Sequence, residues 1–248
     1  MPQLPEEIEA MRAAEGGAEK SKYVRRMFSE IAPRYDLLNH VLSLNIDRAW
    51  RRAAIRELRI ERNPTGTYLD ICAGTLDVSA MIASTHTSAN VIGADFAEPM
   101  LRAGVSKIGD RNIVPVTADA LMLPLRDNSV SGAIVAFGIR NVADLDQGLR
   151  EINRVLEPGS RFVILEFSTP RSRVVNSAYQ LYFNHVLPRI GAIVSGHGTA
   201  YTYLPKSVAN FPATDALAKR MKGAGFANVS WRSFTMGIVA IHIGEKAL

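Results

Sequence analysis

The chain is poor in cysteine, with Cys72 as the only one in 248 residues. A single cysteine excludes an internal disulfide and a cysteine-rich metal cluster, and it is typical of a reducing compartment. Long hydrophobic runs are lacking as well, because none reaches the roughly 18 residues of a membrane-spanning helix. The first stretch, MPQLPEEIEAMRAAEGG, is acidic and unlike a signal peptide. We therefore expect a cytoplasmic protein, and an association with the inner face of the membrane stays open.

Several functional motifs are also absent. The chain has no P-loop, no G-x-S-x-G and no H-E-x-x-H. Its 5 histidines show no metal-ligand spacing, so we expect no metal. It carries no recognisable RNA-binding module, so we expect no nucleic-acid partner.

What the chain does contain is enough apolar residue, 47%, to bury a sizeable core. We expect a disordered lead-in over residues 1–19, which are rich in Glu, Ala and Gly, and a single domain over 20–248. The net charge of +5 permits an anionic membrane surface, a nucleic acid or an anionic substrate and does not choose among them.

The domain should begin with a helical cap over residues 20–62. Two helices in it, Lys22 to Ala32 and a second from Asp47, carry an apolar stripe beside several arginines. Such a basic face is either solvated or used to dock on a membrane, with the solvated face favoured.

Strand and helix patterns alternate along the rest of the chain. Strands are predicted over residues 68–71, 91–95, 113–117, 132–137 and 161–167, followed by a hairpin over 229–234 and 237–243. This order predicts an α/β fold with a doubly wound, seven-stranded sheet and an antiparallel closing hairpin. The interruption over 169–212 contains an aromatic helix (Tyr179, Tyr182, Phe183, Leu187) and predicts an insert that forms a lid or substrate wall.

Polar residues follow several of these strands where parallel strands would end at one edge of the sheet. Asp95 is placed to accept both hydroxyls of a ribose, or else to cap the next helix. Asp119 could accept from an adenine amine while Ala120 leaves room for the ring, and the alternative is an Asx turn. Arg140, at the end of a buried strand, should face a cleft or a carboxylate.

The loop after the first strand, TYLDICAGTLD, is the clearest candidate for a nucleotide-type site. Its spacing, Asp70-x-Cys72-x-Gly74-x-Leu76, resembles D-x-G-x-G-x-G, the first-strand loop of S-adenosylmethionine (SAM) methyltransferases. Taken alone this is a weak signal, because many α/β proteins have a glycine turn after a strand.

Longer motifs resemble one family, the ubiquinone/menaquinone biosynthesis C-methyltransferases of the UbiE/MenG type. They are YDLLNHVLSLNIDRAW, FGIRNV, RVLEPGSRFVILEFS, AYTYLPKSVANFP, AGF and GIVAIH, in that order from residue 35 to residue 242. The resemblance implies a Rossmann-like fold and SAM-dependent methylation of a ring carbon of a polyprenylated quinol. The favoured acceptor is demethylmenaquinol, and 2-methoxy-6-polyprenyl-1,4-benzoquinol is the alternative.

The resemblance also implies residue roles. SAM would be contacted by Thr75, Asp95, Asp119 and Ala120, with Asp70 and Gly74 shaping its loop. Arg140, Asn141, Tyr35, Asp36 and Asn39 would line the quinol pocket. We expect Arg140 to stabilise an ionised quinol oxygen and Asn141 to orient the ring. The proton acceptor, a water or Asp36, is left open.

The chain departs from the family at four positions, with Leu76 for the last loop glycine, Asp47 for a histidine, Ala136 for a serine and Leu121 for a glutamate. Leu76 matters most, because its Cβ could crowd SAM or occupy a backbone position with positive φ. A methyltransferase acting on RNA or protein and a non-catalytic member that has lost SAM are the other functions considered. The sequence does not distinguish a monomer from a homodimer.

Overall fold

Seven strands form one sheet in the order β3-β2-β1-β4-β5-β7-β6 in a computed structural model of the chain. The structure describes residues 5–15, 18–36, 43, 45–170, 172–181 and 199–248. The strands are β1 Thr67–Ile71, β2 Asn90–Asp95, β3 Ile113–Thr117, β4 Val130–Ala136, β5 Leu156–Phe167, β6 Phe226–Phe234 and β7 Val239–Lys246. Strands β1 to β5 pair in parallel, and β7 runs antiparallel to both β5 and β6. The predicted sheet and its closing hairpin are confirmed.

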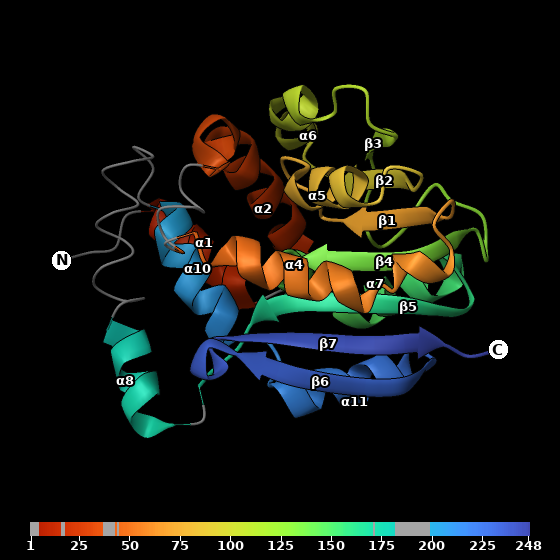
Figure 1. The fold of residues 1–248 in the computed structure, drawn as a ribbon. Helices are drawn as coiled ribbons and strands as arrows, with labels where there is room; N and C mark the ends of the chain where they lie inside the picture. The colour runs from red at the N-terminus through yellow and green to blue at the C-terminus, as the bar shows by residue number, and fades with distance from the viewer. Residues whose placement is uncertain (1–4, 16–17, 37–42, 44, 171, 182–198) are drawn as a thin grey trace.

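Helices cover both faces of the sheet because its central strands are apolar on both sides (Figure 1). On β1, Leu69 and Ile71 pack with α7 (Leu145–Val155) and α11 (Thr214–Gly223) on one face. Tyr68 points the other way, into a core formed with α4 (Asp47–Glu57) and α5 (Asp77–Thr85). This alternation is the two-residue period of a strand, and it produces three layers. A shorter helix, α6 (Glu98–Gly104), follows β2.

A helical cap lies at the end of the sheet where the parallel strands terminate, on the left in Figure 1. It consists of α1 (Pro5–Glu15), α2 (Ala18–Ile31), α8 (Arg173–Leu181) and α10 (Thr199–Ala209). Buried side chains of these four helices form one cluster that includes Val24, Met27, Tyr179 and Tyr203. The N-terminal helices α1 and α2 therefore pack against α8 and α10 of the insert, although the two pairs are far apart in the sequence.

The structure differs from the sequence prediction at the N-terminus. Residues 1–19 were expected to be a disordered lead-in, but Pro5–Glu15 is the helix α1 and α2 begins at Ala18. Ala10, Ala13 and Ala14 are buried, and Asn210 after α10 donates to the carbonyl of Ala14 at 2.9 Å. A small alanine face gives a weak sequence signal, yet it lets two helices approach closely.

The insert is only partly described. Tyr179 of its predicted aromatic helix is buried in the cap, whereas Tyr182, Phe183 and Leu187 lie outside the described residues. Within the described part of the chain, none of the helices combines the length and the apolar character needed to cross a bilayer.

Candidate active site

The loop after β1 has an unusual backbone. Cys72, Gly74 and Leu76 have φ angles of 54°, 53° and 64°, in the left-handed region that favours glycine. Leu76 is fully buried, and its side chain fills the space above Gly93 of β2, where an added Cβ would lie 2.5 Å from Leu76 Cδ2. Leu76 does not line either of the pockets described below. The departure from glycine therefore affects the backbone of the loop and the core beneath it.

Asp70 connects the end of β1 to α5. Its carboxylate accepts from the backbone N–H of Ser79 at 3.0 Å and from the Ser79 hydroxyl at 2.6 Å. Burial raises the pKa of Asp70 to about 7, although the two hydrogen bonds from Ser79 act in the opposite direction. Asp70 thus ties the end of β1 to the first turns of α5.

Asp95 ends β2 and holds the same loop from the other side. Its Oδ2 accepts from Gly74 N at 2.8 Å, and its Oδ1 accepts from Ala97 N at 2.8 Å. The second bond forms an Asx turn before α6 and is not the helix cap of the alternative interpretation, because Ala97 is the N-cap residue and no side chain caps this helix. Burial raises the pKa of Asp95, while the backbone donors of Ala97 and Gly74 and the charge of Arg25 lower it.

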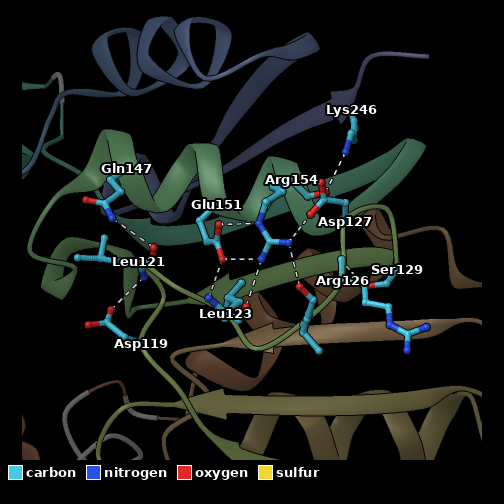
Figure 2. A network of polar contacts seen from close by, with 11 residues as sticks. Asp119, Leu121, Leu123, Arg126, Asp127, Ser129, Gln147, Glu151, Arg154 and Lys246 are labelled. Atoms are coloured by element: carbon cyan, nitrogen blue, oxygen red, sulfur yellow. Dashed lines mark hydrogen bonds and ion pairs between the residues drawn. The ribbon is translucent and has the colours of Figure 1, made fainter.

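Asp119 and Ala120 lie in the loop after β3. Asp119 Oδ1 accepts from Leu121 N at 2.9 Å, so the Asx turn is present. Helix α7 holds this loop through the network in Figure 2. Glu151 accepts from Leu123 N at 2.6 Å, and Arg154 donates to the carbonyls of Leu123 and Leu125 at 3.2 and 2.9 Å.

These strand ends line a hollow of about 410 Å³, a volume that includes space open to solvent. Its lining includes the acidic residues Asp95 and Asp119 and the apolar residues Ile71, Cys72, Ala94, Ala118, Ala120, Leu123 and Val142. A carboxylate beside an apolar slot fits the ribose and adenine of SAM. A second pocket of about 300 Å³ lies across the β1 loop and is lined by Tyr35, Arg51, Thr75 and Ala136, among others. The predicted SAM residues are thus brought together around two adjoining pockets.

Arg140 and Asn141 follow β4 in a short turn, η4 (Ile139–Asn141). Arg140 Nη1 lies 2.8 Å from Glu166 Oε1 and also donates to the carbonyl of Phe137. Asn141 lines the larger pocket, and its Oδ1 accepts from the Tyr203 hydroxyl of α10 at 3.0 Å. Arg140 therefore faces a carboxylate, one of the two surroundings that the sequence predicts. Its Nε is buried and makes no hydrogen bond with the described residues.

The residues of the N-terminal segment that were predicted to line a quinol pocket are in different positions. Tyr35 lines the second pocket. Asp36 does not line it but contacts the lining residue Thr75, because its Oδ1 accepts from the Thr75 hydroxyl, and its Oδ2 is 2.6 Å from Lys107 Nζ. Asn39 lies outside the described residues. For the described part of the chain, no group of three or more His, Cys, Asp and Glu residues is arranged to hold a metal ion.

Sequence reasoning missed several residues that touch the site residues. Among them are Glu166, Tyr203 and Lys107, which contact Arg140, Asn141 and Asp36 respectively. Glu166 and Tyr203 stand inside the motifs quoted above. The only signal for either was the expectation that Arg140, at the end of a buried strand, faces a carboxylate or a cleft. Lys107 had no signal, because its partners come from segments remote in the sequence.

Solved structures share the fold. A SAM-dependent methyltransferase from Thermotoga maritima aligns with a TM-score of 0.61 at 18% identity over 89% of this chain and 98% of that one. The cyclase SpnF aligns with a TM-score of 0.69 at 15% identity over 92% and 97% of the two chains. Because one neighbour is a methyltransferase and another is a cyclase, the fold does not fix the function.

Sequence relatives are more specific. A demethylmenaquinone methyltransferase from Deinococcus radiodurans is 45% identical over 92% of this chain and 94% of its own length. A protein of the same name from Thermus thermophilus is 45% identical over 89% and 100% of the two chains. The ubiquinone/menaquinone biosynthesis C-methyltransferase UbiE of Geobacter sulfurreducens is 45% identical over 93% and 91%. The profile of the ubiE/COQ5 methyltransferase family matches residues 17–246, and the chain belongs to this family.

Proposed function

We propose that this chain transfers a methyl group from SAM to a ring carbon of a polyprenylated quinol, with demethylmenaquinol as the favoured acceptor. Two relatives at 45% identity carry the name demethylmenaquinone methyltransferase. The observation that carries the proposal is the buried Arg140–Asn141 turn beside the cofactor pocket. Such a turn offers a charge and an amide to an oxygen-bearing ring.

The task of the protein is to make a ring carbon nucleophilic, since SAM supplies an already electrophilic methyl group. Ionising a quinol hydroxyl does so, and at a pKa near that of tyrosine it costs about 4 kcal/mol at pH 7. The free Nε donor of Arg140 is suited to stabilise the resulting oxyanion. Glu166 keeps the guanidinium in place, 2.8 Å away. Phe137 and Phe167, with ring centroids 4.8 Å apart, supply an aromatic wall beside it.

The contacts of Asp36 favour water as the proton acceptor. Both of its carboxylate oxygens are engaged, Oδ1 with Thr75 and Oδ2 with Lys107. Asp36 therefore serves to hold the cofactor loop. The methyl group leaves the sulfur of SAM, so S-adenosylhomocysteine is the leaving group, and the ring proton that the methyl group replaces passes to solvent while the ionised hydroxyl regains its proton.

A competition experiment tests the acceptor. Purified protein, labelled SAM and an equimolar mixture of demethylmenaquinol and 2-methoxy-6-polyprenyl-1,4-benzoquinol are combined in detergent, and the products are resolved by mass spectrometry. We expect label in menaquinol. Label in the benzoquinol product alone would move the chain to the other branch, and label in neither, with SAM bound, would refute the quinol proposal.

We also propose that the protein works at an anionic membrane surface. Arg48, Arg52 and Arg56 are exposed at four-residue spacing along α4, so they form one stripe on that helix. Together with Lys107 and Arg111 they line an open groove between α4 and α5. A prenylated acceptor resides in the bilayer, and an excess of cations in one groove attracts acidic headgroups.

Vesicle sedimentation tests this docking. We expect binding to vesicles that contain phosphatidylglycerol, weak binding to pure phosphatidylcholine, and loss of binding at high salt. Charge reversal of Arg48 and Arg52 to Glu should abolish it, whereas reversal of the exposed Lys219 and Lys222 on α11 should not. Equal binding to neutral vesicles, or equal effects of the two pairs, would contradict the proposal.

A further inference from the structure

Lys107 joins three separate pieces of the candidate site. Its Nζ lies 2.6 Å from Asp36 Oδ2, 3.1 Å from Thr75 Oγ1 and 2.5 Å from Asp77 Oδ1. Asp36 belongs to the N-terminal segment, Thr75 to the cofactor loop and Asp77 to the first turn of α5. We propose that Lys107 is a positioning residue, which fixes the Tyr35–Asp36 segment against the cofactor loop and so aligns acceptor with donor. The role in alignment rests on the proposed function, whereas the contact itself does not.

The charges explain why a cation is needed at this point. Asp36 and Asp77 both approach the same ammonium group, and the Thr75 hydroxyl donates to Asp36. Burial acts to raise the pKa of Asp77, but Arg51 and Lys107 outweigh it and lower that pKa overall. Without Lys107, the cation that the two carboxylates share would be lost, and Asp36 would have no counter-ion among the described residues.

The backbone of α6 is shaped to bring Lys107 to this place. A Cβ added to Gly104, the last residue of α6, would lie 2.3 Å from the carbonyl oxygen of Thr75. Only glycine permits so close an approach of two backbones. The next turn, η3 (Val105–Lys107), then carries the lysine over the loop. This approach is a second observation, independent of the charges, that links the end of α6 to the cofactor loop.

The two aspartates depend on Lys107 to different degrees. Asp77 has a second cation, because Arg51 Nη1 lies 2.7 Å from its Oδ2 and is held in turn by Asp47 at 3.1 Å. Among the described residues, Lys107 is the only cation that pairs with Asp36, whose other carboxylate oxygen accepts from the neutral Thr75 hydroxyl. Loss of Lys107 should therefore release the N-terminal segment while α5 stays in place. The effect should fall on the acceptor side of the site more than on the fold.

The first test measures structure without substrate. Amide hydrogen exchange is followed by mass spectrometry in wild type, Lys107→Met and Lys107→Arg. We expect about tenfold faster exchange in peptides that contain Tyr35 and Asp36 in Lys107→Met, with β4 and β5 unchanged. Lys107→Arg keeps a cation and should stay near wild type. Unchanged exchange in Lys107→Met would refute the positioning role, whatever the acceptor is.

The second test measures the consequence for the reaction. We expect Lys107→Met to raise the KM for the quinol and lower kcat by about tenfold each, with Lys107→Arg restoring most of both. Lys219→Met, on the exposed face of α11, is the control and should behave as wild type. Asp36→Asn combined with Lys107→Met should add little to either single change. If Lys107→Met showed faster exchange but normal kinetics, the contact would stand and its role in alignment would be overturned. If the effects of Asp36→Asn and Lys107→Met were fully additive, the link through Asp36 would be overturned.

Discussion

Arg140 Nη1 and Glu166 Oε1 lie 2.8 Å apart, and their side chains are 8% and 2% exposed. Burial raises the pKa of Glu166, and the charge of Arg140 opposes that shift. A pair of this kind leaves a buried, uncompensated charge when one partner is removed. The pair thus ties the end of β4 to β5 at the point where the proposed oxyanion forms.

Neutralising the carboxylate tests this relationship. We expect Glu166→Gln to lower the free energy of unfolding by about 3 to 5 kcal/mol, since Arg140 keeps its charge without a counter-ion. Urea denaturation measures the change. A loss no larger than that of an exposed pair such as Arg220 with Asp146 would show that the buried charges are not coupled.

Asp70 predicts a pH dependence of stability. The pKa of Asp70 is about 7 in the folded protein, against about 3.9 in an unfolded chain. The folded state therefore binds the extra proton, so the contribution of Asp70 to stability is full below about pH 4 and is lost as the pH rises through about 7. Asp70→Asn keeps an oxygen acceptor for Ser79 and removes the titration. In urea denaturation from pH 5 to pH 8, the free energy of unfolding of the variant should increase relative to that of wild type as the pH rises. A difference between the two that stays constant with pH would contradict this prediction.

Replacing Leu76 with the glycine of the family should destabilise the protein, although glycine suits the left-handed backbone at this position. Its left-handed backbone costs about 1 to 2 kcal/mol. Deleting a buried leucine costs about 2 to 5 kcal/mol, and Leu76 fills the space above Gly93. We therefore expect Leu76→Gly to lower the free energy of unfolding by about 1 to 3 kcal/mol while SAM affinity, measured by calorimetry, changes little. A large gain in SAM affinity would show instead that Leu76 crowds the cofactor.

The network in Figure 2 predicts that a change in α7 weakens SAM binding through the loop after β3. Glu151 accepts from Leu123 N at 2.6 Å, and Leu123 lines the larger pocket. We expect Glu151→Ala to weaken SAM binding by about tenfold, because a buried donor and the loop it anchors are released. Asp146→Ala on the same helix removes an exposed pair and serves as the control. Equal SAM affinities in the two variants would show that the bond between Glu151 and Leu123 does not support the pocket.

Local sequence patterns predict much of this fold, because alternating strand and helix segments of this kind assemble into a parallel sheet. The acidic residues at the ends of β1 and β2 could be expected at one edge, since parallel strands bring their carboxyl ends together. Asp70 and Asp95 indeed hold the same loop from its two sides. The left-handed backbone at Leu76 was one of two expectations for that departure, and the structure has it.

The rest depends on contacts between distant segments, which no local pattern reveals. Lys107 meets Asp36 and Thr75 only because Gly104 lets α6 touch the loop. Helix α1 is stabilised by α10, almost 200 positions later in the chain, through a face of alanines that resembles a disordered segment. Tertiary packing decides such elements, and their intrinsic propensities do not.

The most direct measurement is methyl transfer from labelled SAM to demethylmenaquinol by wild type and by Arg140→Met, side by side at saturating SAM. We expect labelled menaquinol from wild type. In the variant, kcat should be lower by about 100-fold or more with SAM affinity retained, because the charge that stabilises the quinol oxyanion is gone. Absence of product from wild type with SAM bound would contradict the proposed acceptor. Equal rates in the two proteins would contradict the role given to Arg140.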